Sequence, residues 1–166
     1  MKKVLTSLAA LSLALVAVLV LASCGGGVSV SKLESTLKEV DESLTLTESS
    51  SGVYTASTNY EYTVNTNGSK VKSVKIEMPG TASTLKSESA LKTSLSKSAS
   101  KMTRADLAVG YCVLMAGKLR IAVGGSSPTQ EETISFFSSQ TPWTVGSWTI
   151  KAEYSGSNLI LSADLK

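Results

Sequence analysis

Two stretches in which apolar and polar residues alternate, one in each half of the chain, constrain the fold more than any other feature. Side chains of a β-strand point alternately to opposite faces, so this alternation predicts strands with one buried and one solvated face. The first stretch holds Tyr54, Ala56, Tyr60, Tyr62 and Val64, then the turn Asn65-Thr66-Asn67-Gly68, then Val74, Ile76 and Met78. Val71 is out of phase with this pattern, which predicts a β-bulge near residues 69–72.

The second stretch predicts a hairpin at the end of the chain. Its apolar positions are Trp148, Ile150, Ala152 and Tyr154 outbound and Leu159, Leu161, Ala163 and Leu165 on return. The segment Ser155-Gly156-Ser157-Asn158 supplies the turn between them. In the first hairpin Glu61, Lys75 and Glu77 fall on the opposite parity, which predicts a solvated face.

Segments with the spacing of amphipathic helices lie before the first hairpin and between the two hairpins. Val30, Leu33, Leu37, Val40 and Leu44 lie three or four residues apart, which predicts an apolar stripe along a helix. Residues 81–102 predict a weak amphipathic helix, because its many serines compete for backbone hydrogen bonds. The segment Ser127-Pro128-Thr129-Gln130 is typical of a helix start, with Ile134 and Phe137 on the buried face.

Residues 105–123 admit two interpretations. Thr103 and Asp106 have the spacing of a capping box, which favours a buried helix that ends at Gly117 and is followed by a short strand over 118–123. A hairpin that turns at Ala116-Gly117 is the alternative, because tyrosine, cysteine and valine also suit strands.

The N-terminus has the pattern of an export signal. Lys2 and Lys3 precede an apolar run over 8–22 that is short for a membrane-spanning helix and has the length of a signal-peptide core. The run ends in Leu21-Ala22-Ser23-Cys24, which resembles the lipobox of bacterial lipoproteins: a branched apolar residue, two small residues and a cysteine. No family resemblance is found for residues 28–166.

The lipoprotein resemblance implies a role for one residue, Cys24. It would carry a diacylglycerol on its sulfur, and the peptide before it would be removed. We therefore expect a signal peptide over 1–23, a lipidated and glycine-rich tether over 24–29, and a single domain over 30–166. The anchor would be the contact with the membrane, and Gly25, which is not aspartate, favours the outer membrane in a host that has two membranes.

For the mature chain the patterns predict an α+β fold. An antiparallel sheet is built from hairpins near both ends of the mature chain, and helices from the middle cover one of its faces. Strands of the two hairpins can then pair at the centre of the sheet, which makes a single domain.

Composition excludes several kinds of chemistry. The chain has no histidine, which removes histidine-dependent catalysis and the usual zinc sites. Loss of Lys2 and Lys3 lowers the formal charge of +3 to +1, too little for a surface that binds nucleic acid. With Cys24 lipidated, Cys112 has no partner for a disulfide, and its apolar neighbours predict a buried thiol. We expect no cofactor, no metal and no enzymatic activity.

Aromatic residues near the C-terminal end are the candidate contacts. We single out Trp143, Phe136 and Trp148, and Trp143 most of all, because it follows Pro142 in an expected loop. Trp143 either contacts a ligand or partner or lines the edge of its own core. A basic surface formed by Lys86, Lys92, Lys97, Lys101 and Arg104 is either a solvated helix face or a membrane contact.

The sequence favours a lipid-anchored envelope protein that acts by protein–protein contact, as an accessory or adhesion-type lipoprotein. The alternative is a carrier of an apolar ligand in a pocket between sheet and helices. A hydrolase without histidine is a third possibility, and the cross-strand neighbours Glu61 and Glu77 would be its carboxylate pair; Lys75 beside them favours a surface ion pair instead.

Overall fold

The computed structural model describes residues 27–166, so the signal sequence and Cys24 lie outside the described part. Seven strands form one antiparallel sheet in the order β1-β2-β3-β4-β7-β6-β5. Their bounds are β1 Thr47–Ser50, β2 Val53–Ser57, β3 Glu61–Asn67, β4 Lys70–Met78, β5 Trp143–Val145, β6 Trp148–Ser155 and β7 Asn158–Leu165. The predicted α+β fold is confirmed, and β4 pairs with β7 at the centre of the sheet.

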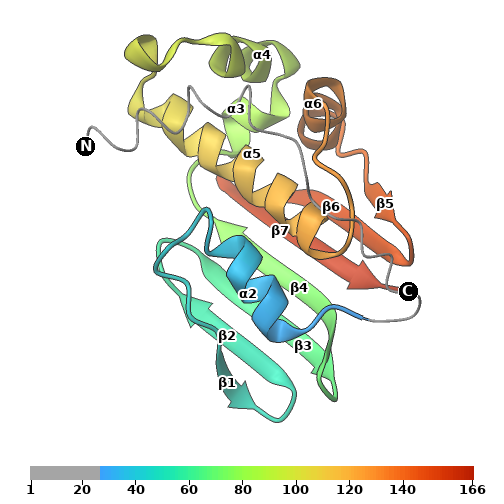
Figure 1. Ribbon diagram of the computed structural model, residues 1–166. Helices are drawn as coiled ribbons and strands as arrows, with labels where there is room; N and C mark the ends of the chain where they lie inside the picture. Colours follow the sequence, from blue (N-terminus) through green and yellow to red (C-terminus); the bar gives the residue numbers. More distant parts are fainter. Residues whose placement is uncertain (1–26) are drawn as a thin grey trace.

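The helices lie on one face of this sheet (Figure 1). Their bounds are α2 Val30–Leu37, α3 Ala82–Lys86, α4 Glu88–Ser96, α5 Arg104–Ala122 and α6 Gln130–Ser138, with a 3-10 turn at Ala99–Lys101. Alternate strand residues that face the helices, such as Val64, Ile76 and Leu161, are fully buried. The cover was predicted to come from helices in the middle of the chain, and in the structure α2 also contributes to it. None of the helices in the described range is long and apolar enough to cross a bilayer.

The two predicted hairpins are present. β6 and β7 pair from Trp148↔Leu165 to Ser155↔Asn158, as the alternation predicts. In the β3–β4 hairpin the pairing moves from Asn65↔Ser73 to Thr66↔Val71, which leaves Lys72 without a partner. This is the predicted bulge, and it allows Val71 and Val74 to be buried on the same face.

The start of the first hairpin differs from the prediction. Residues 53–67 form two strands instead of one, because the chain turns at Thr58, whose backbone N–H donates to the carbonyl of Tyr60. The strand β1 adds a further hairpin at the edge of the sheet.

Helix α5 corrects both interpretations of residues 105–123. It is a single helix of 19 residues that begins with the predicted capping box of Thr103 and Asp106. It continues through Gly117, so the expected strand over 118–123 is absent. Its buried residues include Cys112, Met115 and Leu119, which recur at helical spacing and pack against the sheet. The helix ends where Gly124 adopts a positive φ.

Three other helix predictions need smaller corrections. Helix α2 stops at Leu37, although Leu44 is still buried, because the chain turns through Asp41. The helix expected over 81–102 is broken at Ser87, which caps α4. Helix α6 starts two residues later than predicted, with Thr129 as its cap and Glu132 completing a capping box.

Candidate functional site

Helix α6 stands between two open grooves, which we call the α4–α6 groove and the α6–β5 groove. The α4–α6 groove has a volume of about 780 Å³ and the α6–β5 groove about 460 Å³. Both grooves include Glu131 and Ser135, so these two residues lie on the ridge that separates them. A partner that covers this ridge can therefore reach both grooves.

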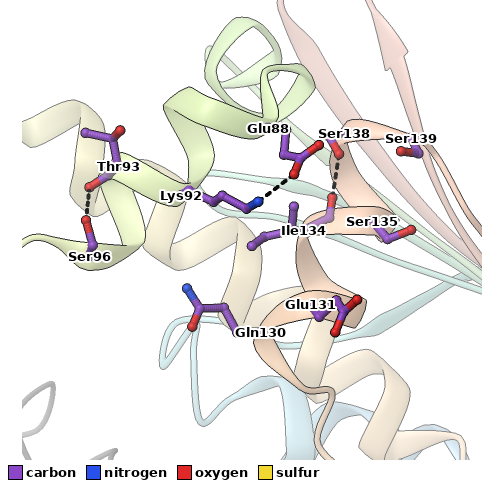
Figure 2. Close-up of a pocket in the computed structure, with 10 residues that line it drawn as sticks. All are labelled: Glu88, Lys92, Thr93, Ser96, Gln130, Glu131, Ile134, Ser135, Ser138 and Ser139. Carbon is purple, nitrogen blue, oxygen red and sulfur yellow. Dashed lines mark hydrogen bonds and ion pairs between the residues drawn. The ribbon is translucent and has the colours of Figure 1, made fainter.

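The α4–α6 groove is lined mainly by polar side chains (Figure 2). Its lining residues are Glu88, Lys92, Thr93 and Ser96 of α4, and Gln130, Glu131, Ile134, Ser135 and Ser138 of α6 with Ser139 after it. Lys92 and Glu88 form an ion pair of 2.6 Å one helical turn apart. The hydroxyls of Ser96 and Ser138 donate to backbone carbonyls of their own helices. This lining offers hydrogen-bonding groups to a ligand, together with apolar surface from Ile134 and from the carbon atoms of the polar side chains.

The α6–β5 groove contains the residue that the sequence singled out most strongly. Trp143 was expected in a loop, but it begins strand β5 and pairs with Ile150 of β6. Its ring stacks on that of Phe136 with the centroids 3.9 Å apart and an interplanar angle of 18°. Only 7% of Trp143 is exposed. The ring thus lines the edge of the core, and only a small part of it is accessible to a partner, at the rim of the α6–β5 groove.

Arg120 lies over the ring of Trp143. Its guanidinium carbon is 5.0 Å from the centroid of the Trp143 ring, within the range of a cation–π contact. One terminal nitrogen donates to a carboxylate oxygen of Glu132 at 3.1 Å. Only 13% of the Arg120 side chain is exposed, and within the described chain Nε and the other terminal nitrogen have no acceptor. Buried donors without a partner are costly, by about 1–3 kcal/mol each.

Glu132 has two roles at this site. Its carboxylate accepts a hydrogen bond of 2.7 Å from the backbone N–H of Thr129, which caps helix α6, and a second bond from Arg120. These two bonds, the backbone one first, lower the pKa of Glu132 below its ordinary value. The carboxylate therefore remains charged at neutral pH and fixes the position of Arg120 over Trp143.

The predicted aromatic candidates are only partly brought together. Phe136 and Trp143 stack on each other, and Phe136 also contacts Phe137 edge to face. Trp148 belongs to neither pair and is buried opposite Leu165 and Val145. Arg120 was missed by the sequence analysis, because residues 118–123 were expected to be a strand. Its partner Glu132 is twelve residues away, so no local pattern indicated the contact.

The other candidate sites are occupied by structural contacts. Cys112 is buried, its sulfur is 3.3 Å from the hydroxyl of Thr81, and burial raises the pKa of its thiol to about 11. The predicted buried thiol is thus confirmed. Glu61 and Glu77 are cross-strand neighbours, and Lys75 lies 3.6 Å from Glu77, which confirms the surface ion pair.

Three of the five basic residues of the surface over 81–104 contact other side chains of the described chain, whereas Lys101 and Arg104 are exposed and form no ion pair there. Lys92 pairs with Glu88, and Lys97 pairs with Asp106 at 2.8 Å. The ammonium of Lys86 lies 4.8 Å from the centroid of the Tyr154 ring.

Within residues 27–166 there is no cluster of three or more histidine, cysteine, aspartate or glutamate side chains that would hold a metal ion. No family model, no curated protein and no solved structure matches this chain.

Proposed function

We propose that this chain is a lipid-anchored envelope protein that acts by protein–protein contact through the ridge of α6 and the grooves on either side. The observation that carries the contact surface is the junction of the two grooves at Glu131 and Ser135, with Trp143 and Arg120 beside it. Tryptophan and arginine are the residue types that most often dominate binding at protein interfaces. Serine and threonine hydroxyls along the grooves supply hydrogen bonds for a polypeptide.

Exposed apolar residues on α5 support the same kind of function. Leu107 and Tyr111 are 41% and 40% exposed, and they lie one helical turn apart on the outer face of α5. Large apolar side chains that face solvent together are typical of a surface that a partner covers.

The anchor rests on Cys24 and the segment before it. Acyl chains at this position would hold the protein on a membrane, since each buried methylene contributes about 0.8 kcal/mol. The outer membrane is the location favoured in a host with two membranes.

The alternative, a carrier of an apolar ligand, requires an enclosed apolar cavity. The two grooves are open to solvent, and most of the residues that line them are polar. They favour contact with a protein surface over enclosure of a lipid or another apolar molecule.

A photo-crosslinking amino acid at Ser135, compared with one at Lys151 on the helix-free face of the sheet, tests the contact surface in cells. We expect one discrete adduct from position 135 and none from position 151. Glu131→Lys, which reverses a charge shared by both grooves, should abolish the adduct, whereas the exposed control Glu153→Lys should leave it unchanged. An adduct that persists in Glu131→Lys, or forms equally from both positions, would refute the proposal.

Mass spectrometry of the N-terminal peptide tests the anchor, and an unmodified Cys24 would refute that part.

A further inference from the structure

The start of the described chain is fixed to one end of the sheet. The carbonyl of Gly27 accepts a hydrogen bond of 3.0 Å from the ammonium of Lys70, at the start of β4. The carbonyl of Val28 accepts a bond of 2.7 Å from the backbone N–H of Val71, and Ser29 forms a β-bridge with Lys70. Gly27, Val28 and Ser29 all lie in the range 24–29 that was expected to be a tether, so the folded domain includes these three residues. The chain therefore leaves the domain at a defined point beside the β3–β4 turn.

The distance from this point to Cys24 is short. Three peptide units join Cys24 to Gly27, and a fully extended chain spans at most about 3.6 Å for each, or about 11 Å in all. The nine residues of β4 are joined by eight steps of about 3.3 Å, so this strand leads roughly 26 Å away from the exit point. We call the end of the sheet near Gly27 the tether end, defined by residues 27–32 and 67–72. Helices α3 and α4 lie at the far end (Figure 1).

The tether end carries positive charge that is not paired with a carboxylate. Lys32, Lys70 and Lys72 are exposed, and none of them forms an ion pair with another described residue. Near the far end Lys92 and Lys97 are paired with carboxylates, whereas Lys101 and Arg104 are exposed and form no ion pair with a described residue. The basic surface that the sequence analysis placed in residues 81–104 is thus at the wrong end of the domain for a short tether, and its charge is partly neutralised.

Both faces of the domain carry charges of both signs. By strand register the helix-free face holds Glu61, Glu77, Glu153 and Asp164 together with Lys70, Lys75 and Lys151. The exposed charged residues on the helical side include Glu39, Glu42 and Glu131 as well as Lys92, Lys101 and Arg104. Neither face therefore has a large excess of positive charge that would hold the domain flat on anionic lipid.

We propose that the tether end rests on the membrane, with Lys32, Lys70 and Lys72 against anionic headgroups and the far end directed away from it. This inference rests on the proposed lipid anchor at Cys24. An anionic leaflet attracts each nearby lysine strongly enough to favour the upright orientation about fivefold per lysine. The ~11 Å limit on the tether keeps all three lysines within reach of the headgroups.

Fluorescence quenching in vesicles tests this orientation. The lipidated chain is reconstituted into vesicles that contain anionic lipid and a lipid with a nitroxide on its headgroup. A fluorophore is attached to Ser69→Cys at the tether end or to Ser100→Cys at the far end. Cys112 is buried and Cys24 is acylated, so only the introduced thiol reacts. We expect strong quenching at position 69 and little at position 100.

The lysines are tested in the same vesicles. Substitution of Lys32, Lys70 and Lys72 by glutamine should raise quenching at position 100 as the domain tilts. The matched control, Lys75→Gln with Lys151→Gln, should leave the pattern unchanged. Equal quenching at the two positions, or stronger quenching at position 100, would overturn the proposal while the anchor stands. Failure of the chain to float with vesicles, together with an unacylated Cys24, would overturn the anchor itself.

Discussion

The buried carboxylate of Asp41 gives the sharpest test of what holds the edge of the fold together. One oxygen accepts hydrogen bonds from the hydroxyls of Tyr62 at 2.8 Å and Thr58 at 2.6 Å. The other accepts a bond of 2.6 Å from Ser43. Asp41 follows α2, whereas Tyr62 lies on β3, so this carboxylate joins the loop that ends the first helix to the sheet. The perturbation is a double-mutant cycle of Asp41→Ala and Tyr62→Phe.

The magnitude follows from the burial of the two partners. A hydrogen bond to a charged group contributes about 1.5–3 kcal/mol, and a buried hydroxyl left without an acceptor adds a penalty. We expect Asp41→Ala to lower the free energy of unfolding by about 2–4 kcal/mol, because the Tyr62 hydroxyl is buried and loses its acceptor. Tyr62→Phe should cost about 2 kcal/mol. In the double variant the losses should fall short of their sum by about 1.5–3 kcal/mol.

Urea unfolding followed by tryptophan fluorescence measures all four free energies. Tyr54→Phe is the matched control: its hydroxyl makes no hydrogen bond to any residue in the described range, so we expect a change below about 0.5 kcal/mol. Losses that add without coupling would refute the reasoning, because they would mean that Asp41 and Tyr62 stabilise the fold independently of each other.

The same carboxylate predicts a pH dependence. Burial favours its neutral form, but the hydrogen bonds from Ser43, Thr58 and Tyr62 outweigh burial and lower the pKa of Asp41 below 3.8. A carboxylate whose pKa is lowered by folding stabilises the protein above its unfolded pKa, and this contribution is lost as the pH falls through the folded pKa. Between pH 5 and pH 3 the stability of the wild type should therefore fall more steeply than that of Asp41→Ala. Parallel pH curves would contradict this assignment.

Three further predictions concern helix α5 and the turn that follows it. The thiol of Cys112 should resist a thiol reagent in the folded protein and react at the rate of unfolding, because burial raises its pKa to about 11; fast labelling at pH 8 would contradict this. Gly110→Ala should raise the free energy of unfolding by about 0.5–1 kcal/mol, since the added methyl meets no atom within 4 Å in the middle of the helix. Gly125→Ala should lower it by about 1–3 kcal/mol, because the methyl would lie 2.8 Å from the Arg120 side chain and 3.0 Å from that of Val145. Urea unfolding measures both, and equal effects of the two substitutions would refute the packing argument.

The sequence predicted those parts of the fold that depend on local periodicity. The β6–β7 hairpin and the bulge at Lys72 follow from alternation alone, because one face of each strand must be buried. Gly117 was expected to end the helix, so the continuation of α5 past this residue was not predicted. That residue is tolerated inside the helix, and the buried positions Leu119 and Ala122 extend the helical period through a segment that also alternates. After α2 the chain turns through Asp41, whose partners Thr58 and Tyr62 are distant in sequence.

The candidate site was predictable only in part, for a similar reason. Phe136 and Trp143 were found because aromatic residues are rare in this chain and gather near its C-terminal end. Arg120 was not found, since its contacts with Glu132 and Trp143 form only after α5, α6 and β5 have packed. The α4–α6 groove depends on how α4 packs beside α6, and the α6–β5 groove on how α5, α6 and β5 pack together, which no local residue pattern indicates.

The position of the exit point bears on how the proposed contact surface is used. Helix α4 lies at the end of the sheet opposite Gly27, and it forms one wall of the α4–α6 groove. With the tether end on a membrane, the α4 wall of this groove lies at the end of the domain that is far from the headgroups. A partner can then cover the ridge of α6 without displacing lipid, whereas the lysines at the other end keep their contact with the membrane. Anchor and contact surface are thus separated along the strands, and each can be altered by substitution without direct contact with the other.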